Sequence, residues 1–352
     1  MNVFLHGRGL VCGLGDSLAE SVARLNDVDF KPTARLLPDG STRPYFMMSG
    51  QDLPWAQRIN QLVVKAIDEA GITNNKDMPL LIASSCIHVG LIEEVRVFPK
   101  SCWAFAEYIR DTLAWRGPVY LLPVACTASM QAMLMAQAMM QSGMCDEAVI
   151  LGVELCSRIT VSGFASMQLL APEAAQPLGK QRNGMVLGEA VVALHVSNKP
   201  ARWQLLGGAS VICGQDMTGA SPTVVRKLCE KALLSSLLSA DAVDLVKLQA
   251  SGSPQNDKNE MLGLTEAFDN MPALTTLKHR VGHTLGASGL VETLLLIACL
   301  ERKINLTFDY DLDETLAQNL AAVYPAVEHL LAIILGFSGE HAALVLKDCE
   351  VA

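Results

Sequence analysis

The central feature of the sequence is the turn Val124-Ala125-Cys126-Thr127-Ala128-Ser129, which separates two apolar segments of different type. Residues 119–122 before it are typical of a β-strand, and residues 130–141 after it, rich in Met and Ala, predict a helix. Cys126 is therefore expected at the start of a buried helix, where unpaired N–H groups and the helix dipole favour the thiolate. The same N–H groups could hold an oxyanion while the thiolate attacks an acyl carbonyl. A small core cysteine is the alternative interpretation of this residue taken alone.

Helical patterns alternate with short apolar runs in both halves of the chain, which favours parallel strands joined by crossover helices. No linker rich in Pro, Gly or Ser divides the chain, and we place the boundary between the halves near residues 197–202. The predicted strands are residues 80–84, 119–122, 148–151, 243–248, 332–335 and 342–346. The predicted helices are residues 58–70, 130–141 and 224–238, one that begins at Asp257 and one that follows His283.

Two glycine-rich stretches in the second half complement the Cys126 turn. The first, Lys278-His279-Arg280-Val281-Gly282-His283-Thr284-Leu285-Gly286-Ala287, precedes another helix start, and the second, Gly336-Phe337-Ser338-Gly339, ends an apolar run. In this order and spacing, the three stretches resemble the β-ketoacyl-acyl-carrier-protein synthases, the condensing enzymes of the thiolase superfamily. Residues 6–15 and 177–189 are similar to further segments of that family, so the resemblance covers nearly the whole chain.

The resemblance implies an α/β, thiolase-like fold of five layers, α-β-α-β-α, built from two similar halves. Residues 1–198 would form the N-terminal half, which carries the nucleophilic cysteine. Residues 199–352 would form the C-terminal half, which carries the catalytic histidine and the Gly-Phe turn. The helices that follow Cys126 and His283 would then start from related places and meet at a central site.

The resemblance also implies roles for individual side chains. Cys126 would take an acyl chain from a phosphopantetheine thioester, and the N–H groups of Cys126 and Phe337 would form the oxyanion hole. His283 would donate a hydrogen bond to the oxygen that becomes negative when a malonyl unit loses carbon dioxide. Lys278 would order the site by charge, in a buried pair with Glu292. The alternatives are structural: a core ring for Phe337, a satisfied histidine and a surface lysine.

One departure from the family pattern bears on activity. Residues 246–257 match a loop in which the family carries a first catalytic histidine followed by Gly-Thr, and this chain has Gln249, Ala250 and Ser251 there. Glutamine donates and accepts hydrogen bonds but cannot hold a proton near neutral pH. We expect the Cys126-Gln249-His283 set to support acyl transfer better than malonyl decarboxylation. His341 follows the Gly-Phe turn closely enough to be a weaker candidate for the site.

Composition and charge limit the classes of partner that the protein can bind. The formal net charge of −9 and the absence of a basic stripe argue against nucleic acid, whereas an acidic carrier protein needs only a local basic patch. A hydrophobic content of 51% predicts extensive burial, including a subunit interface. The 10 cysteines lack disulfide or zinc-site spacing, no signal peptide is visible, and no apolar run is long enough for a membrane span. We therefore expect a soluble cytoplasmic protein without a bound metal.

Three functional hypotheses follow. The first is a chain-length-factor-like partner in a heterodimeric ketosynthase of a type II fatty acid or polyketide pathway, polyene pathways included. The second is an independent homodimeric β-ketoacyl synthase with a Cys-Gln-His site, and the third is a non-catalytic acyl-binding scaffold. The first two require an acyl carrier protein as partner. None requires a cofactor of its own, because the phosphopantetheine arm arrives on the carrier protein.

Overall fold

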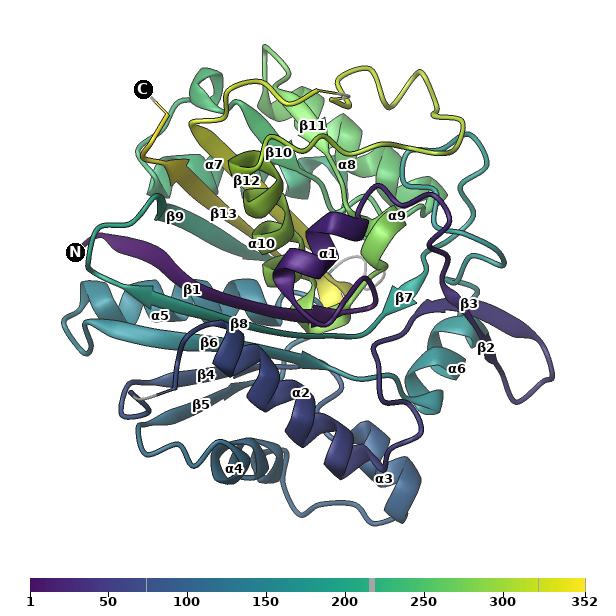
Figure 1. Ribbon diagram of the computed structural model, residues 1–352. Helices are drawn as coiled ribbons and strands as arrows, with labels where there is room; N and C mark the ends of the chain where they lie inside the picture. Colours follow the sequence, from purple (N-terminus) through teal and green to yellow (C-terminus); the bar gives the residue numbers. More distant parts are fainter. Residues whose placement is uncertain (74, 215–218, 322, 352) are drawn as a thin grey trace.

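Ten of the described strands form two groups of five with the same internal order (Figure 1). The computed structural model describes residues 1–73, 75–214, 219–321 and 323–351. In each group the first strand pairs antiparallel with the fifth and the fifth pairs antiparallel with the fourth, while the fourth, second and third run parallel. The first group contains β1 (Val3–Cys12), β4 (Leu80–Ala83), β5 (Val119–Leu122), β6 (Glu147–Glu154) and β8 (Ala190–Ser197). The second contains β9 (Trp203–Ile212), β10 (Leu245–Lys247), β11 (Ala273–Thr275), β12 (His329–Leu335) and β13 (Glu340–Asp348).

The two groups join through β1 and β9, so that all ten strands form one continuous sheet. Helix α5 contacts strands of both groups, and α10 contacts both β8 and β12, so these two helices lie between the groups. Helices α2 and α4 cover the outer face of the first group, and α7 covers that of the second, with α8 beside it. The helices are α2 (Trp55–Glu69), α4 (Trp103–Thr112), α5 (Ala128–Gln141), α7 (Pro222–Ser235), α8 (Pro254–Ala267) and α10 (Ser288–Glu301). The predicted five-layer thiolase-like fold is confirmed.

Shorter elements surround this framework. Strands β2, β3 and β7 form a separate three-stranded sheet, in which β7 lies beside the turn that follows α9. The bounds are β2 (Thr33–Leu36), β3 (Thr42–Phe46), β7 (Leu187–Gly188), α1 (Leu18–Arg24), α3 (Val89–Val95), α6 (Arg158–Ser166), α9 (Lys278–Val281), η1 (Ala240–Ala242), η2 (Leu285–Ala287) and η3 (Phe337–Gly339). The division at residues 198 and 199, which stays a prediction, falls in the connection between β8 and β9. No helix within the described ranges combines the length and the apolar character that a bilayer span requires.

Helix α10 is buried on all sides because both of its faces meet protein. Every residue of α10 from Ser288 to Cys299 is buried, which is the pattern of a helix enclosed in a core. Gly289 permits a very close approach to α5, since a Cβ there would lie 2.5 Å from the Cγ of Met130. The turns that precede α5 and α10 therefore meet at one end of the central layer.

Several predicted helix boundaries differ from the structure by one to three residues, and α2, for example, begins at Trp55 and not at residue 58. The helix expected from Asp257 begins three residues earlier, because Pro254 occupies its first turn, where proline is favourable. Asp257 lies inside that turn and accepts hydrogen bonds from the backbone N–H groups of Leu178, Ser251 and Gly252. Helix α7 ends at Ser235 and not at residue 238.

A buried ion pair connects the outer helix α2 to the strands next to the site. Both terminal nitrogens of Arg58 bind Glu189, each at 2.6 Å, and the carboxylate also accepts the N–H groups of Met48 and Cys156. Such bidentate pairs are strong and geometrically specific. The neighbouring Gly188 donates its N–H to the carbonyl of His283 at 3.1 Å, so the pair helps to hold the His283 segment.

The substitution Arg58→Met should destabilise the protein strongly, because it leaves the Glu189 carboxylate buried without its cation. We expect the free energy of unfolding to fall by about 3–5 kcal/mol in urea denaturation. Arg116→Met is the matched control, since it breaks the exposed pair with Asp77, and it should change stability little. Equal losses in the two variants would contradict this assignment.

Candidate active site

Four of the five predicted site residues line one cavity between the two halves. Cys126, Gln249, His283 and Phe337 all border it, although they come from four separate segments of the chain. The cavity measures about 20 Å³, which is room for about one water molecule. Its other lining residues are Met185, Gly219, Ala250, Ser251, Asn256, Asp257, Glu260 and Leu335. The structure thus brings together residues that the sequence separates by more than two hundred positions.

Cys126 immediately precedes Thr127, the N-cap residue of α5, as the sequence predicts. Burial raises the pKa of its thiol to about 11, while the backbone N–H of Phe337, which hydrogen-bonds the thiol, and the charge of Lys278 act to lower it. That the helix start favours the thiolate stays a prediction; in this enclosed site the loss of water outweighs the N–H of Phe337 and the charge of Lys278. The contact does place the Phe337 N–H beside the sulfur, where an oxyanion would form.

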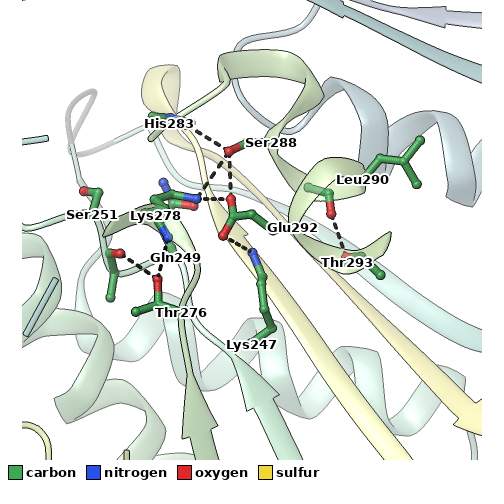
Figure 2. Close-up of polar contacts among 12 residues, drawn as sticks. Lys247, Gln249, Ser251, Thr276, Lys278, His283, Ser288, Leu290, Glu292 and Thr293 are labelled. Atoms are coloured by element: carbon green, nitrogen blue, oxygen red, sulfur yellow. Dashed lines mark hydrogen bonds and ion pairs between the residues drawn. The ribbon is translucent and has the colours of Figure 1, made fainter. Parts of the chain in front are cut away.

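Lys278 lies behind His283 and does not line the cavity. Its ammonium pairs with Glu292, so the predicted buried pair is present. Ser288 joins this pair to the imidazole: its Oγ lies 3.1 Å from Nδ1 of His283 and 2.8 Å from Oε1 of Glu292 (Figure 2). Burial, followed by the charges of Lys278 and Lys247, holds the pKa of His283 well below 6.5. The imidazole is therefore neutral.

Lys247 is a charged member of this cluster that the sequence reading did not single out. It ends β10, is fully buried, and places its Nζ 3.3 Å from Oε2 of Glu292, opposite Lys278 (Figure 2). Burial lowers the pKa of Lys247 to about 8, against the attraction of Glu292. Burial alone would raise the pKa of Glu292, but the two lysines bring it below its ordinary value. The sequence signal that could have identified Lys247 is its position as a single lysine within the apolar run of residues 245–248.

Gln249 follows β10 on a loop that two carboxylates of α8 anchor. Glu260 accepts the N–H groups of Gln249 and Ala250, each at 2.7 Å, and Asp257 accepts those of the next two residues. Burial raises the pKa of Glu260 to about 7 and that of Asp257 to about 6. The side-chain Oε1 of Gln249 is buried without a hydrogen-bond partner among the described residues. The amide is thus presented to the cavity with unused hydrogen-bonding capacity.

Glu154, at the end of β6, is a second residue that the sequence reading missed. Its carboxylate accepts the N–H groups of Ser85, Cys86 and Gly286, and burial raises its pKa to about 7. The hydroxyl of Ser85 in turn donates to the carbonyl of Ala125 at 2.6 Å. Glu154 therefore links the turn before Cys126 to the turn after His283. His341, the weaker candidate, is buried in β13 and is not among the residues that line the cavity.

The raised thiol pKa predicts slow alkylation of Cys126 at neutral pH. Its rate with iodoacetamide should rise about tenfold per pH unit, because the thiolate fraction grows in this way below the pKa. Peptide mapping by mass spectrometry would give this rate beside that of the exposed Cys102 as internal reference. Alkylation of Cys126 at pH 7 as fast as that of Cys102 would contradict the prediction.

Comparison with known proteins matches most of the chain to one family. Residues 62–201 match the model of the beta-ketoacyl synthase N-terminal domain, and residues 206–307 match that of the C-terminal domain. The highly reducing polyketide synthase alnA of Emericella nidulans is 28% identical over 68% of this chain and 11% of its own length. The 3-oxoacyl-acyl-carrier-protein synthase 2 of Synechocystis is 26% identical over 68% of this chain and 63% of its own length. The chain thus spans less than two thirds of either relative.

Solved structures share the fold over the full chain. The ketosynthase of Xenorhabdus doucetiae in complex with its chain length factor superposes with a TM-score of 0.83 at 20% identity, over 99% of this chain and 98% of that one. The ishigamide ketosynthase/chain length factor gives 0.79 at 19% identity, over 98% of each chain. The two matched domains contain the motifs around Cys126 and His283, and the shared fold covers the chain nearly to its full length. This chain belongs to the β-ketoacyl synthase family.

Proposed function

We propose that this chain is the chain-length-factor-like subunit of a heterodimeric ketosynthase in a type II fatty acid or polyketide pathway, polyene pathways included. Gln249 carries the proposal, because it borders the same cavity as Cys126 and His283 where the family resemblance places a histidine. Its amide can polarise a carbonyl but cannot exchange a proton. A complete ketosynthase partner would perform the decarboxylative condensation, with both acyl and malonyl groups delivered by an acyl carrier protein.

The size of the cavity supports a shared acyl tunnel. A cavity of about 20 Å³ beside Cys126, which has room for about one water molecule, cannot enclose an extended acyl chain. A chain that grows on the partner would then have to lie across the contact between the two subunits. The retained Cys126, His283 and Lys278 leave this subunit an acyl-accepting site of its own.

A surface suited to a partner lies at the end of the sheet. Among the described residues β5 pairs only with β4, so its outer edge offers free backbone groups to another chain. Helix α4 packs on β5. The segment that leads into α4 exposes several apolar side chains, and Phe98 is 79% exposed. The others are Val95, Val97 and Trp103. Several exposed apolar side chains so close in sequence are typical of protein interfaces.

The solved complexes described above are ketosynthases bound to chain length factors, which supports the same kind of assembly here. The retained Cys126, Lys278 and His283 favour an independent homodimeric synthase as the second candidate. A scaffold without chemistry would have little need of this set. We also propose a cytoplasmic location, because the 10 cysteines lack the spacing of a disulfide framework.

The test is intact mass spectrometry of the purified chain with acyl- and malonyl-carrier protein, alone and with a complete ketosynthase from the same source. We expect no β-ketoacyl product from the chain alone, and both product and a stable one-to-one complex with the ketosynthase. Cys126→Ser serves as the control for acylation at this thiol. Released product from the chain alone would overturn the proposal in favour of the independent synthase.

Gln249→His should confer condensation on the chain itself, because it restores a group that can exchange a proton at that position. We expect the rate of β-ketoacyl product formation by the variant alone to rise about tenfold or more above background. Gln249→Asn, which shortens the amide without adding a titratable group, is the matched control. Equal rates for both variants would show that residue 249 does not limit the reaction.

A further inference from the structure

A pocket of about 210 Å³ lies between α2, α3 and α4, apart from the cavity that contains Cys126, with which it shares no lining residue. Three aromatic rings, those of Trp55, Phe105 and Tyr108, form much of its wall, together with aliphatic side chains. A dry cavity of about 150 Å³ is enough to take up benzene. This pocket therefore has room for one ring with a short substituent, or for a short aliphatic chain.

Helix α3 borders the pocket without being packed into the core. None of its seven residues is buried, and two of its carboxylates hold it in place. Glu94 accepts the backbone N–H of Trp55 at 2.8 Å, and Glu93 accepts that of Arg158, at the start of α6, at 2.9 Å. A Cβ at Gly90 would lie 2.5 Å from Cδ1 of Trp55, so the helix backbone comes very close to the indole. Because polar contacts anchor α3, its aliphatic side chains are left to border a space and not a core.

Two polar groups on the pocket wall are buried without a hydrogen bond. His88, the residue before α3, is 5% exposed, and its ring nitrogens have no hydrogen-bond partner among the described residues. The indole nitrogen of Trp55 also lacks an acceptor there. The other two buried indoles, those of Trp115 and Trp203, donate to a carbonyl at 2.9 Å and to a carboxylate at 3.0 Å, as buried indoles usually do. An apolar pocket with a few unused polar groups has the form of a small-molecule site.

The backbone fixes the imidazole of His88 at the pocket. The preceding Ile87 has a φ of 44°, in the left-handed region that β-branched residues rarely adopt. Its N–H donates to Oγ of Ser84 at 2.8 Å, and the His88 ring lies against that of Phe105, with centroids 6.2 Å apart. Strained residues of this kind cluster at functional sites and ligand clamps. The fold thus specifies the position of the imidazole although no polar partner holds it.

The two unused groups define the chemistry of a ligand. Burial lowers the pKa of His88, so its imidazole is neutral and offers one donor and one acceptor nitrogen, while the indole of Trp55 offers a donor. A hydroxyl both donates and accepts, so it can satisfy either group or both. A carboxylate or an ammonium group would instead bring an unpaired charge into an apolar pocket, which is costly.

We propose that this pocket binds a small hydrocarbon with one hydroxyl group, a phenol or a short-chain alcohol, whose hydroxyl lies against His88 and Trp55 and whose body lies among the aromatic side chains. This inference goes beyond the proposed function and does not rest on it. Val97, which is 65% exposed, borders the pocket and also belongs to the segment assigned above to a partner surface. A side chain of the partner is therefore the competing occupant, and binding by the chain alone decides between the two.

The test uses the full chain with ¹⁵N in its indole nitrogens, whose N–H signals report on each tryptophan separately. The chain has 4 tryptophans, and Trp55→Phe identifies the signal of Trp55 by its loss. We expect para-ethylphenol and hexanol to shift this signal along a saturable curve while the signal of Trp115 stays unchanged. Tighter binding of one of them assigns the body of the ligand as aromatic or aliphatic. A Trp55 signal that neither compound shifts, or a shift that Trp115 shares, would overturn the proposal.

Ethylbenzene tests the hydroxyl, because it keeps the ring and the ethyl group of para-ethylphenol. We expect it to bind about tenfold more weakly or worse, since it displaces water from His88 and Trp55 without replacing the hydrogen bonds of that water. Equal affinities of ethylbenzene and para-ethylphenol would overturn the assigned class of ligand.

Variants test the site and its polar group separately. His88→Phe keeps a ring but removes its nitrogens, and it should reduce the preference for para-ethylphenol over ethylbenzene severalfold. His329→Phe, in β12 of the second half, is the matched control and should keep the preference. Ala104→Phe fills the pocket and should abolish binding of both compounds, while unchanged Trp115 and Trp203 signals verify that each variant is folded. Wild-type affinities in Ala104→Phe would overturn the location of the site, and a wild-type preference in His88→Phe would overturn the role of the imidazole.

Discussion

The packing of α5 and α10 between two groups of strands excludes water from the centre of the molecule, and the chemistry of the site follows from this exclusion. A charged group in that layer must find its partner within the protein, since an unpaired buried charge is costly. Glu292 meets this requirement with two lysines, and Glu154, Glu260 and Asp257 meet it with backbone N–H groups. The same burial that creates these partnerships raises the pKa values of Cys126 and of the three carboxylates.

The internal duplication explains how the site is assembled. Both groups of strands have the same order, so α5, which follows the third strand of the first group, and α10, which follows the third strand of the second, start at equivalent positions in the two halves. One half contributes the thiol in this way, and the other contributes the imidazole and the residues that orient it. Glu154 of the first half reaches the turn that follows His283 in the second, so the two contributions are held together by a direct hydrogen bond. Glutamine at position 249, where the family carries a histidine, can therefore weaken malonyl decarboxylation while the residues for acyl transfer stay in place.

Local patterns carried much of the sequence-based prediction. The Cys126 turn, the helix after it and the small-residue stretch around His283 are contiguous signals, and the structure gathers four of the five expected site residues at one cavity. The two missed residues, Lys247 and Glu154, have partners that are distant in the sequence and so form no local pattern. Lys247 lies 45 positions from its partner Glu292, and Glu154 lies 69 positions from its partner Ser85. The raised pKa of the Cys126 thiol could not be read from the sequence for a related reason: a helix start is visible there, whereas the depth of its burial is a property of the assembled layers. The early start of α8 shows a smaller error of the same kind: the helix was predicted to begin at Asp257, whose carboxylate instead accepts backbone N–H groups of other segments from within the first turn.

The close crossing of the central helices has a consequence for the evolution of activity in this chain. Gly289 lies one residue after Ser288, and it faces Met130, four residues after Cys126, with no space for even a methyl group between them. The separation of thiol and imidazole therefore depends on the missing side chain of Gly289 and on the bulk of Met130, neither of which takes part in any reaction. Drift at this contact would alter catalytic geometry while every reacting group stayed the same. A lineage could in this way lose or regain reactivity through its core packing alone.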